Sequence, residues 1–202
     1  MTSLQRLPTR LDGLVLLEPA VHGDERGFFV ETYGREAYQA VGIGVAFVQD
    51  NHSRSSHDAL RGLHYQRRPG QAKLVRAARG SIWDVAVDIR VGSPTFGEFE
   101  AFELDDVTHR QLFVPIGFAH GFCVLSEVAD VAYKVSSPYV ADEERGIAWD
   151  DPNLAIPWPA ATPLLSERDR LNPSLASIPH VDLGLGTYKL IAPARRSARA
   201  IE

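Results

Sequence analysis

The stretch SIWDVAVDIR, residues 81–90, alternates apolar and polar side chains with a period of two. Such alternation is the pattern of a β-strand, whose successive side chains point to opposite faces of a sheet. One face carries Trp83, Val85, Val87 and Ile89, and the other carries mostly Asp84, Asp88 and Arg90. The stretch therefore predicts a β-strand.

Short runs rich in Val, Ile and Phe continue on both sides of this strand, from Leu14 to Val135. Turn residues interrupt them at short, roughly even spacing, as in GLVLLEP (13–19), VAFVQDN (45–51) and RQLFVPIG (110–117). This spacing is typical of an all-β sandwich or barrel. Residues 35–43 suit a short helix, and the Pro-, Asp- and Glu-rich region after Val135 is expected to wrap the barrel in loops and short helical turns.

The chain has 202 residues, 45% of them hydrophobic and 23% charged, which is an ordinary globular mixture. This length favours one domain, which we place at residues 1–190, with two small domains as the alternative. Residues 191–202 are small and basic, and we predict a flexible tail.

Other features of the composition exclude several classes of protein. Cys123 is the only cysteine, so no disulfide can form within the chain. No apolar signal core follows Met1, and the apolar runs are too short to cross a bilayer. The net charge of −5 argues against binding to nucleic acid or to a membrane surface, while a local basic pocket for a phosphate stays open. We expect a soluble cytoplasmic protein.

Several polar residues lie in strand-like runs, where an apolar core would not be expected to contain them. The strand-like run LRGLHYQ, residues 60–66, contains Arg61 and His64. The two have opposite strand parity, so either a bulge at Gly62 brings both to one ligand or one of them reaches the site from its rim. Tyr133 also falls on a strand face that is otherwise apolar, and Lys73 stands between Ala72 and Leu74 in a strand. An ordinary buried tyrosine and a solvated edge lysine are the alternatives for these two.

The run PIGFAHGF, residues 115–122, contains Pro115, Gly117 and His120. This pattern resembles the second motif of the cupins, a family of small β-barrels, and predicts a cupin-type jelly-roll β-barrel with short peripheral helices. Cupins often hold a divalent metal with histidines and a glutamate. The first cupin motif needs His-x-His, whereas His64 is followed by Tyr65 and Gln66, so a metal site is only the second hypothesis.

Seven stretches, from about Gly13 to about Pro173, resemble the dTDP-4-dehydrorhamnose 3,5-epimerase family. They are GDERGFFVETY, FVQDNHS, LRGLHYQ, AKLVRAARGSIWDVAVDIRVGSPTFG, PIGFAHGF, YKVSSPY and LSERD, in the order of the family. The resemblance implies epimerisation at C3 and C5 of dTDP-4-dehydro-6-deoxy-D-glucose through an enolate, without cofactor or metal, in deoxysugar (rhamnose) biosynthesis.

The resemblance also implies roles for individual residues. The catalytic residues would be His64 as the base, Tyr133 as the acid on the opposite face of the sugar, Asp169 as the partner of His64, and Lys73 near the C4 oxygen. Arg26 and Arg61 would contact the diphosphate, and Tyr139 would stack on the thymine. The other implied substrate contacts are Phe29, Glu31, Gln49, Asn51, His120, Glu144 and Arg168.

The expected partners are the dTDP-linked 4-keto-6-deoxy sugar and a second copy of the chain, paired through exposed N-terminal strands. Two alternatives stay open. The first is a mono-epimerase or ketoisomerase acting on a related dTDP-4-keto-6-deoxy sugar, and the second is a metal-dependent cupin.

Overall fold

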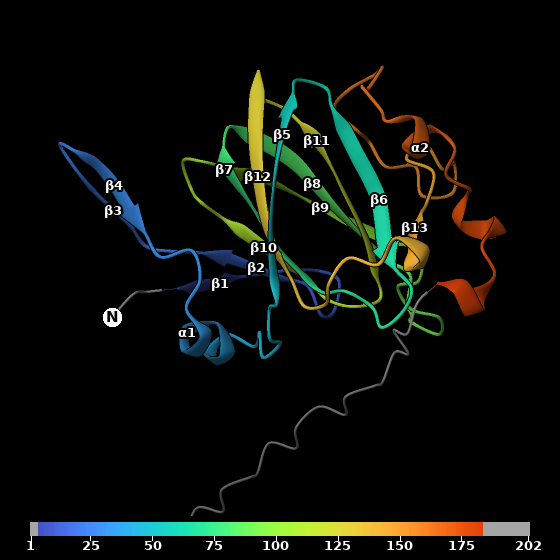
Figure 1. Ribbon diagram of the computed structural model, residues 1–202, viewed down its shortest axis with the longest axis horizontal. Coiled ribbons are helices and arrows are strands. Elements are labelled where there is room, and N and C mark those ends of the chain that lie inside the picture. The colour runs from blue at the N-terminus through green and yellow to red at the C-terminus, as the bar shows by residue number, and fades with distance from the viewer. Residues whose placement is uncertain (1–3, 184–202) are drawn as a thin grey trace, which may run out of the picture.

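Two antiparallel β-sheets packed face to face form the body of the protein (Figure 1). The computed structural model describes residues 4–183. The first sheet has the strand order β1-β2-β10-β7-β12-β5, made of β1 (Gln5–Leu7), β2 (Val15–Glu18), β10 (Gln111–Val114), β7 (Lys73–Arg79), β12 (Val128–Val135) and β5 (Gln49–Ser56). The second has the order β13-β6-β11-β8-β9, made of β13 (Glu144–Gly146), β6 (Leu60–Gln66), β11 (Phe118–Val124), β8 (Ser81–Asp88) and β9 (Phe99–Asp105). The prediction of an all-β sandwich or barrel is confirmed.

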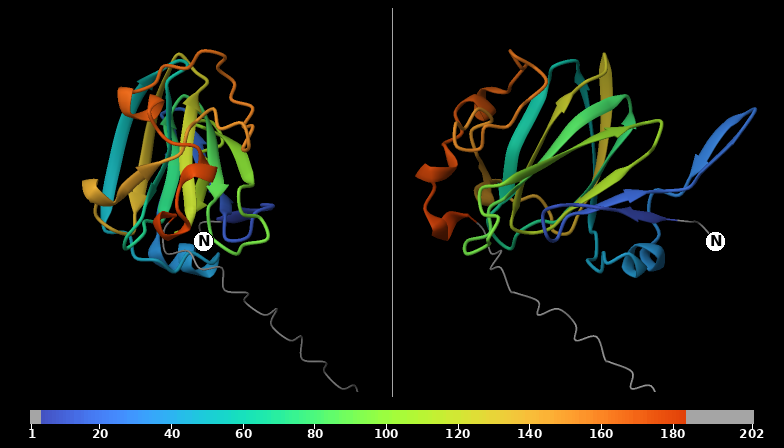
Figure 2. Two further views of the ribbon diagram at one scale, coloured as in Figure 1. Left: turned by 90° about the vertical axis from the view of Figure 1, so that its right-hand side faces the viewer. Right: turned by 180° about the vertical axis from the view of Figure 1, so that it is seen from behind.

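A separate hairpin and a few short helices complete the fold. Strands β3 (Val21–Asp24) and β4 (Gly27–Val30) pair with each other and project away from the sheets (Figure 1). The predicted helix at 35–43 forms as α1 (Arg35–Ala40). After β12 the chain runs through η1 (Ala141–Glu143), α2 (Glu167–Arg170), η2 (Leu175–Ser177) and η3 (His180–Asp182), as short helical turns around the second sheet (Figure 2). No helix within residues 4–183 is long and apolar enough to cross a membrane.

The space between the sheets holds one of the main apolar clusters, which includes Leu14, Val75, Ile82, Leu112, Phe122 and Val131. A second cluster lies on the outer face of the five-stranded sheet, where the C-terminal segment covers Val85, Val87 and Ile89. The strand predicted at 81–90 is therefore buried on both faces. Its Asp84 face points into the sandwich, and its apolar face points outward beneath the C-terminal cover.

The described residues reach to within seven positions of the predicted domain boundary at residue 190. The two sheets share the cluster between them, and the C-terminal segment packs on one of them, so these residues share a common core. The tail predicted at 191–202 lies outside the described residues.

Candidate active site

A cavity of about 580 Å³ opens between the two sheets. It contains most of the site residues that the sequence predicts, namely Gln49, Asn51, Arg61, His64, Lys73, His120, Tyr133, Tyr139, Glu144, Arg168 and Asp169. They come from both sheets and from the segment around α2. The fold therefore gathers these residues from distant parts of the chain into one site.

One wall of the cavity carries a histidine–aspartate pair. Nε2 of His64, on β6, lies 2.6 Å from Oδ1 of Asp169 in α2. Ser166 caps this short helix by accepting a hydrogen bond from the Asp169 backbone N–H, and the Gly62 backbone bonds the carboxylate. Burial alone would raise the pKa of Asp169, but the hydrogen bonds from His64 and from the Gly62 backbone hold this pKa below its ordinary value. A carboxylate so held fixes the orientation of the imidazole and stabilises its protonated form.

Arg61 and His64 both line this cavity, because β6 carries a bulge between them. His64 pairs with His120 and Arg61 pairs with Phe122, so three steps along β6 match two along β11. Gly62 makes the bulge possible. Its φ is +126°, and a Cβ there would lie 2.5 Å from the Cα of Gly121. Of the two arrangements that the sequence left open, the structure has the bulge.

The facing wall belongs to the six-stranded sheet and carries Tyr133 on β12 and Lys73 on β7. Burial raises the pKa of Tyr133, and the nearby charge of Glu144 raises it further, so the phenol keeps its proton at neutral pH. Burial lowers the pKa of Lys73 to about 8. The Lys73 ammonium donates a hydrogen bond of 3.4 Å to the backbone carbonyl of His64 and so reaches across the cavity.

A second histidine–aspartate pair lies deeper in the site. Nε2 of His120 is 2.9 Å from Oδ2 of Asp84, whose side chain is fully buried. The sequence analysis placed Asp84 on the polar face of its strand but gave it no role in the site. Within residues 4–183, no three His, Cys, Asp or Glu side chains gather as a metal site.

Three polar side chains at the rim of the cavity, Tyr139, Glu144 and Arg168, bind one another. Tyr139 donates a hydrogen bond of 2.9 Å from its hydroxyl to Oε2 of Glu144, and the Arg168 guanidinium pairs with the same oxygen. Burial would raise the pKa of Glu144, but the hydrogen bonds from Arg168 and Tyr139 leave it below its ordinary value. Glu144 is thus an anion in a network of hydrogen bonds at the rim of the cavity.

Three predicted substrate contacts do not lie in this cavity. Arg26 is at the tip of the β3–β4 hairpin, where it pairs with Asp24, and its side chain is 85% exposed. Phe29 is 68% exposed on β4, and Glu31 follows that strand. These three residues do not line the cavity of their own chain, because the hairpin points away from the sandwich (Figure 1).

The cavity also contains residues that the sequence analysis missed. Ser53 and Gln71 line it, and Ser55 accepts a hydrogen bond of 2.9 Å from Nε of Arg61. A signal for two of them was present in QDNHSRSS, residues 49–56. There, polar residues recur at every second position on the face that Gln49 and Asn51 share.

Together, a cupin-type β-sandwich and a cavity with a histidine–aspartate pair facing a protonated tyrosine define an enzyme that moves protons by acid–base chemistry. The sequence also matches the family described as dTDP-4-dehydrorhamnose 3,5-epimerase over residues 8–177. The chain belongs to this family of epimerases.

Individual relatives cover nearly the same region. A dTDP-4-dehydrorhamnose 3,5-epimerase of Pseudomonas aeruginosa is 53% identical over 165 residues, which is 81% of this chain and 91% of the relative. The crystal structure of a dTDP-6-deoxy-D-glucose-3,5-epimerase of Legionella pneumophila, in complex with dTDP-4-keto-L-rhamnose, superposes with a TM-score of 0.89 at 44% identity. That comparison covers 93% of this chain and all of the other. A dTDP-4-dehydrorhamnose 3-epimerase of Streptomyces niveus is 41% identical over 81% of this chain and 80% of its own length.

Proposed function

We propose that the protein epimerises C3 and C5 of dTDP-4-dehydro-6-deoxy-D-glucose to give dTDP-4-dehydro-L-rhamnose, in deoxysugar biosynthesis. The observation that carries this proposal is the placement of His64, with Asp169 behind it, and of Tyr133 on facing walls of one cavity. Epimerisation needs a proton removed from one face of the sugar and another returned to the opposite face. Groups on facing walls suit that requirement.

The C4 ketone of the substrate makes the C–H bonds at C3 and C5 acidic. The imidazole of His64 would take the proton of one of these carbons, leaving an enolate with its negative charge on the C4 oxygen. The Tyr133 hydroxyl would then give its proton to the same carbon from the other side, which restores the ketone with inverted configuration. Proton exchange with solvent returns both side chains to their starting states before the second centre reacts. Groups of this kind each contribute roughly 10²–10⁴ in rate.

The charge that develops on the C4 oxygen requires a donor, and we assign that role to Lys73. Its ammonium lies in the cavity between the two catalytic walls. His120, held by Asp84, would contact the sugar beside it. A positioned donor at a developing oxyanion is worth roughly 2.7–4 kcal/mol.

The nucleotide would occupy the rim and the outer part of the cavity. Arg61, with its side chain directed by Ser55, suits the diphosphate because a planar guanidinium matches phosphate oxygens. The Tyr139 ring is half-exposed at the rim, where it can stack on the thymine, and Arg168 and Glu144 order it. Gln49 and Asn51, joined by a hydrogen bond of 2.8 Å, would bind the thymidine from the edge strand β5.

We further propose a homodimer in which each chain lends its hairpin to the cavity of the other. Strand β5 is the edge of the six-stranded sheet, and within residues 4–183 the hairpin pairs only with itself, so both present open backbone edges. A hairpin from a second copy, lying along β5, would bring Arg26, Phe29 and Glu31 to Gln49 and Asn51. Light scattering should find a dimer, and a monomer would contradict this arrangement.

The test is incubation with the 4-keto sugar nucleotide in deuterated water, followed by NMR. Each carbon that is inverted takes its new hydrogen from solvent, so deuterium at both C3 and C5 is expected. Label at C3 alone would instead indicate a mono-epimerase, the alternative favoured by the similarity to the Streptomyces niveus 3-epimerase. Absence of label at both carbons would refute the proposal.

Substitutions then test the two roles. We expect His64→Asn and Tyr133→Phe each to lower kcat by roughly 10²–10⁴ with the fold intact. Tyr65→Phe is the matched control for the tyrosine. Tyr65 lies on β6 outside the cavity, and its buried hydroxyl has no hydrogen-bond partner among the described residues. If Tyr133→Phe keeps full turnover at both carbons, the assignment of the acid is wrong.

A further inference from the structure

The β3–β4 hairpin has few means of its own to keep one direction. Its two strands pair only with each other among the described residues, and an isolated two-stranded hairpin is marginally stable in water. It nevertheless carries Arg26 and Phe29, which the proposed function brings to the cavity of another copy. Contacts with the body of its own chain can fix its direction before it meets the second copy.

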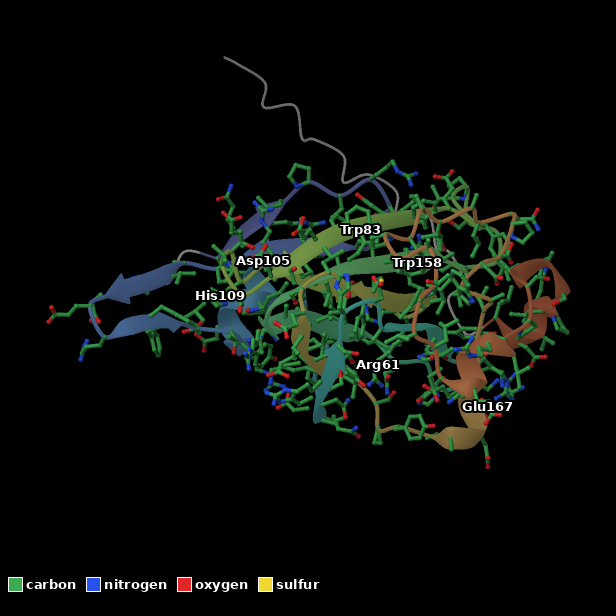
Figure 3. All side chains as sticks on the ribbon, turned by 90° about the horizontal axis from the view of Figure 1, so that it is seen from above. Arg61, Trp83, Asp105, His109, Trp158 and Glu167 are labelled. Carbon is green, nitrogen blue, oxygen red and sulfur yellow. The ribbon has the colours of Figure 1, made fainter. Side chains whose placement is uncertain are left out.

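Three consecutive residues, His109, Arg110 and Gln111, of which the last begins β10, contact the three parts of this hairpin segment. The His109 ring packs against the ring of Phe28 on β4, with the centroids 4.5 Å apart and the planes tilted by 41°. Arg110 pairs through Nε with Oε2 of Glu18, at the entry to the hairpin, at 2.7 Å. Gln111 donates from Nε2 to the carbonyl of Thr32, at the exit, at 3.1 Å. We call residues 109–111 the hairpin clasp. Figure 3 shows His109 at the base of the hairpin.

The backbone of His109 has an unfavourable conformation. Its φ is +54°, a conformation that favours glycine or asparagine, and the residue is only 3% exposed. The buried Nδ1 has no hydrogen-bond partner among the described residues, so no bond at this atom accounts for the histidine. The ring does have a contact with Phe28, which needs no hydrogen bond from that nitrogen.

The loop that presents His109 is itself well ordered. Asp105, at the end of β9, accepts hydrogen bonds from the backbone N–H groups of Val107 and Thr108 and from the Thr108 hydroxyl. The position of the ring is thus set by the rigid sandwich and not by the hairpin.

The clasp determines which face of the hairpin points away from the body of its own chain. Phe28 and Phe29 are neighbours on a strand and point to opposite faces. Because Phe28 contacts His109 of its own chain, Phe29 points away from that contact; in this chain alone Phe28 is 61% exposed and Phe29 is 68% exposed. The same contact that attaches the hairpin therefore presents its substrate-binding face to another molecule.

We propose that His109 is a positioning residue for substrate binding in the partner subunit. By packing against Phe28 it holds the hairpin in the direction that delivers Arg26 and Phe29 to the cavity of the second copy. It touches neither the substrate nor the catalytic groups. This inference rests on the proposed function and on the exchange of hairpins in the dimer.

The first test compares variants of the one side chain. His109→Asn removes the ring and keeps a residue that tolerates the left-handed backbone, so the fold should survive. We expect KM for the dTDP-4-keto sugar to rise about 2- to 12-fold with kcat unchanged, as for a contact worth about 0.5–1.5 kcal/mol. His109→Phe keeps a ring on Phe28 and should restore KM. Val107→Ala, in the same loop and 79% exposed in the parent, is the control and should change neither constant. A KM within experimental error of wild type in His109→Asn would overturn the proposal.

The second test asks in which subunit the defect appears. Two heterodimers are purified with separate tags, each with a single working cavity because Tyr133→Phe silences the other. With His109→Asn and Tyr133→Phe on different chains, the working cavity receives an intact hairpin and should keep the wild-type KM. With both substitutions on one chain beside a wild-type chain, the working cavity receives the loosened hairpin and should show the raised KM. The reverse pattern would overturn the proposal.

Failure of the inference can be told apart from failure of the proposed function. If the wild-type protein turns over the 4-keto sugar and the two heterodimers share one KM, only the role of His109 falls. If the wild-type protein leaves the sugar unchanged in deuterated water, both the proposed function and the inference that rests on it are refuted.

Discussion

Replacing Lys73 with methionine should make the protein more stable and nearly inactive. The ammonium of Lys73 sits in the cavity at the cost of its hydration, and burial accordingly lowers its pKa to about 8 from the ordinary 10.5. The difference between these two values is equivalent to roughly 3 kcal/mol of unfavourable free energy at neutral pH. Because Lys73 keeps some contact with solvent, we take this figure as an upper bound.

Methionine removes that cost and also removes one weak interaction. The hydrogen bond from Lys73 to the His64 carbonyl, at 3.4 Å, is worth about 1 kcal/mol or less. The net gain in the free energy of unfolding should be about 1–2 kcal/mol at pH 7, which corresponds to a Tm higher by roughly 2–8 °C. If Lys73 stabilises the enolate, kcat should fall by roughly 10²–10³ in the same variant.

The dependence on pH tests the physical cause. Between pH 8 and 10.5 the unfolded chain binds the Lys73 proton more tightly than the folded chain does, so the stability of the wild type rises with pH across this window. Urea unfolding at several pH values should therefore show the gap between Lys73→Met and wild type shrinking as the pH rises from 8 to 10.5. Lys134→Met is the control, since Lys134 pairs with Asp50 at 2.7 Å on the outer face and should gain no stability. A Lys73→Met variant less stable than wild type at pH 7 would refute the reasoning.

Three further results are expected. Wild-type kcat/KM should decline above about pH 8 as Lys73 loses its proton, and a profile flat to pH 10 would contradict its role. Asp169→Asn should lower kcat by roughly 10²–10⁴ because the imidazolium of His64 loses its counter-charge, and initial rates within ten-fold of wild type would exclude that role. Gly62→Ala should lower the free energy of unfolding by about 2–5 kcal/mol, since its Cβ would meet the Gly121 backbone. Gly27 has a similar φ of +130° but no atom within 4 Å of the added Cβ, so in urea unfolding Gly27→Ala should lose less.

The strands were predictable because the alternation of apolar and polar residues is a local property. Which face of each strand points into the sandwich was not predictable. In residues 81–90 the apolar face suggests the side that lines the core of a barrel. The structure turns that face outward, because the C-terminal segment covers it and makes a second buried layer. Asp84 then lies inside with His120, although a polar residue on an alternating strand ordinarily faces solvent. Only the course of a distant segment determines this outcome.

The site was predictable residue by residue where the resemblance supplied a match, and its geometry was not. Strict alternation puts Arg61 and His64 on opposite faces. The bulge at Gly62 adds one residue between them, so both side chains point into the cavity. The same matching placed Arg26 and Phe29 with the other substrate contacts, yet the fold carries them out on the hairpin. A sequence motif records that residues meet one ligand, and it does not record which chain brings them there.

The sandwich suits epimerisation because it has two inner walls. Packed sheets lie about 10 Å apart, so inward side chains from the two walls can reach both faces of a sugar ring held between them. A base and an acid on one wall would return the proton to the face it left, which changes nothing. The same burial acts on both titratable groups of the six-stranded wall. It keeps the Tyr133 hydroxyl protonated, as an acid requires, and it weakens the hold of Lys73 on its proton. The Lys73 charge is therefore the costly part of the site, and the free energy it costs in the empty cavity is recovered when a negative oxygen forms beside it.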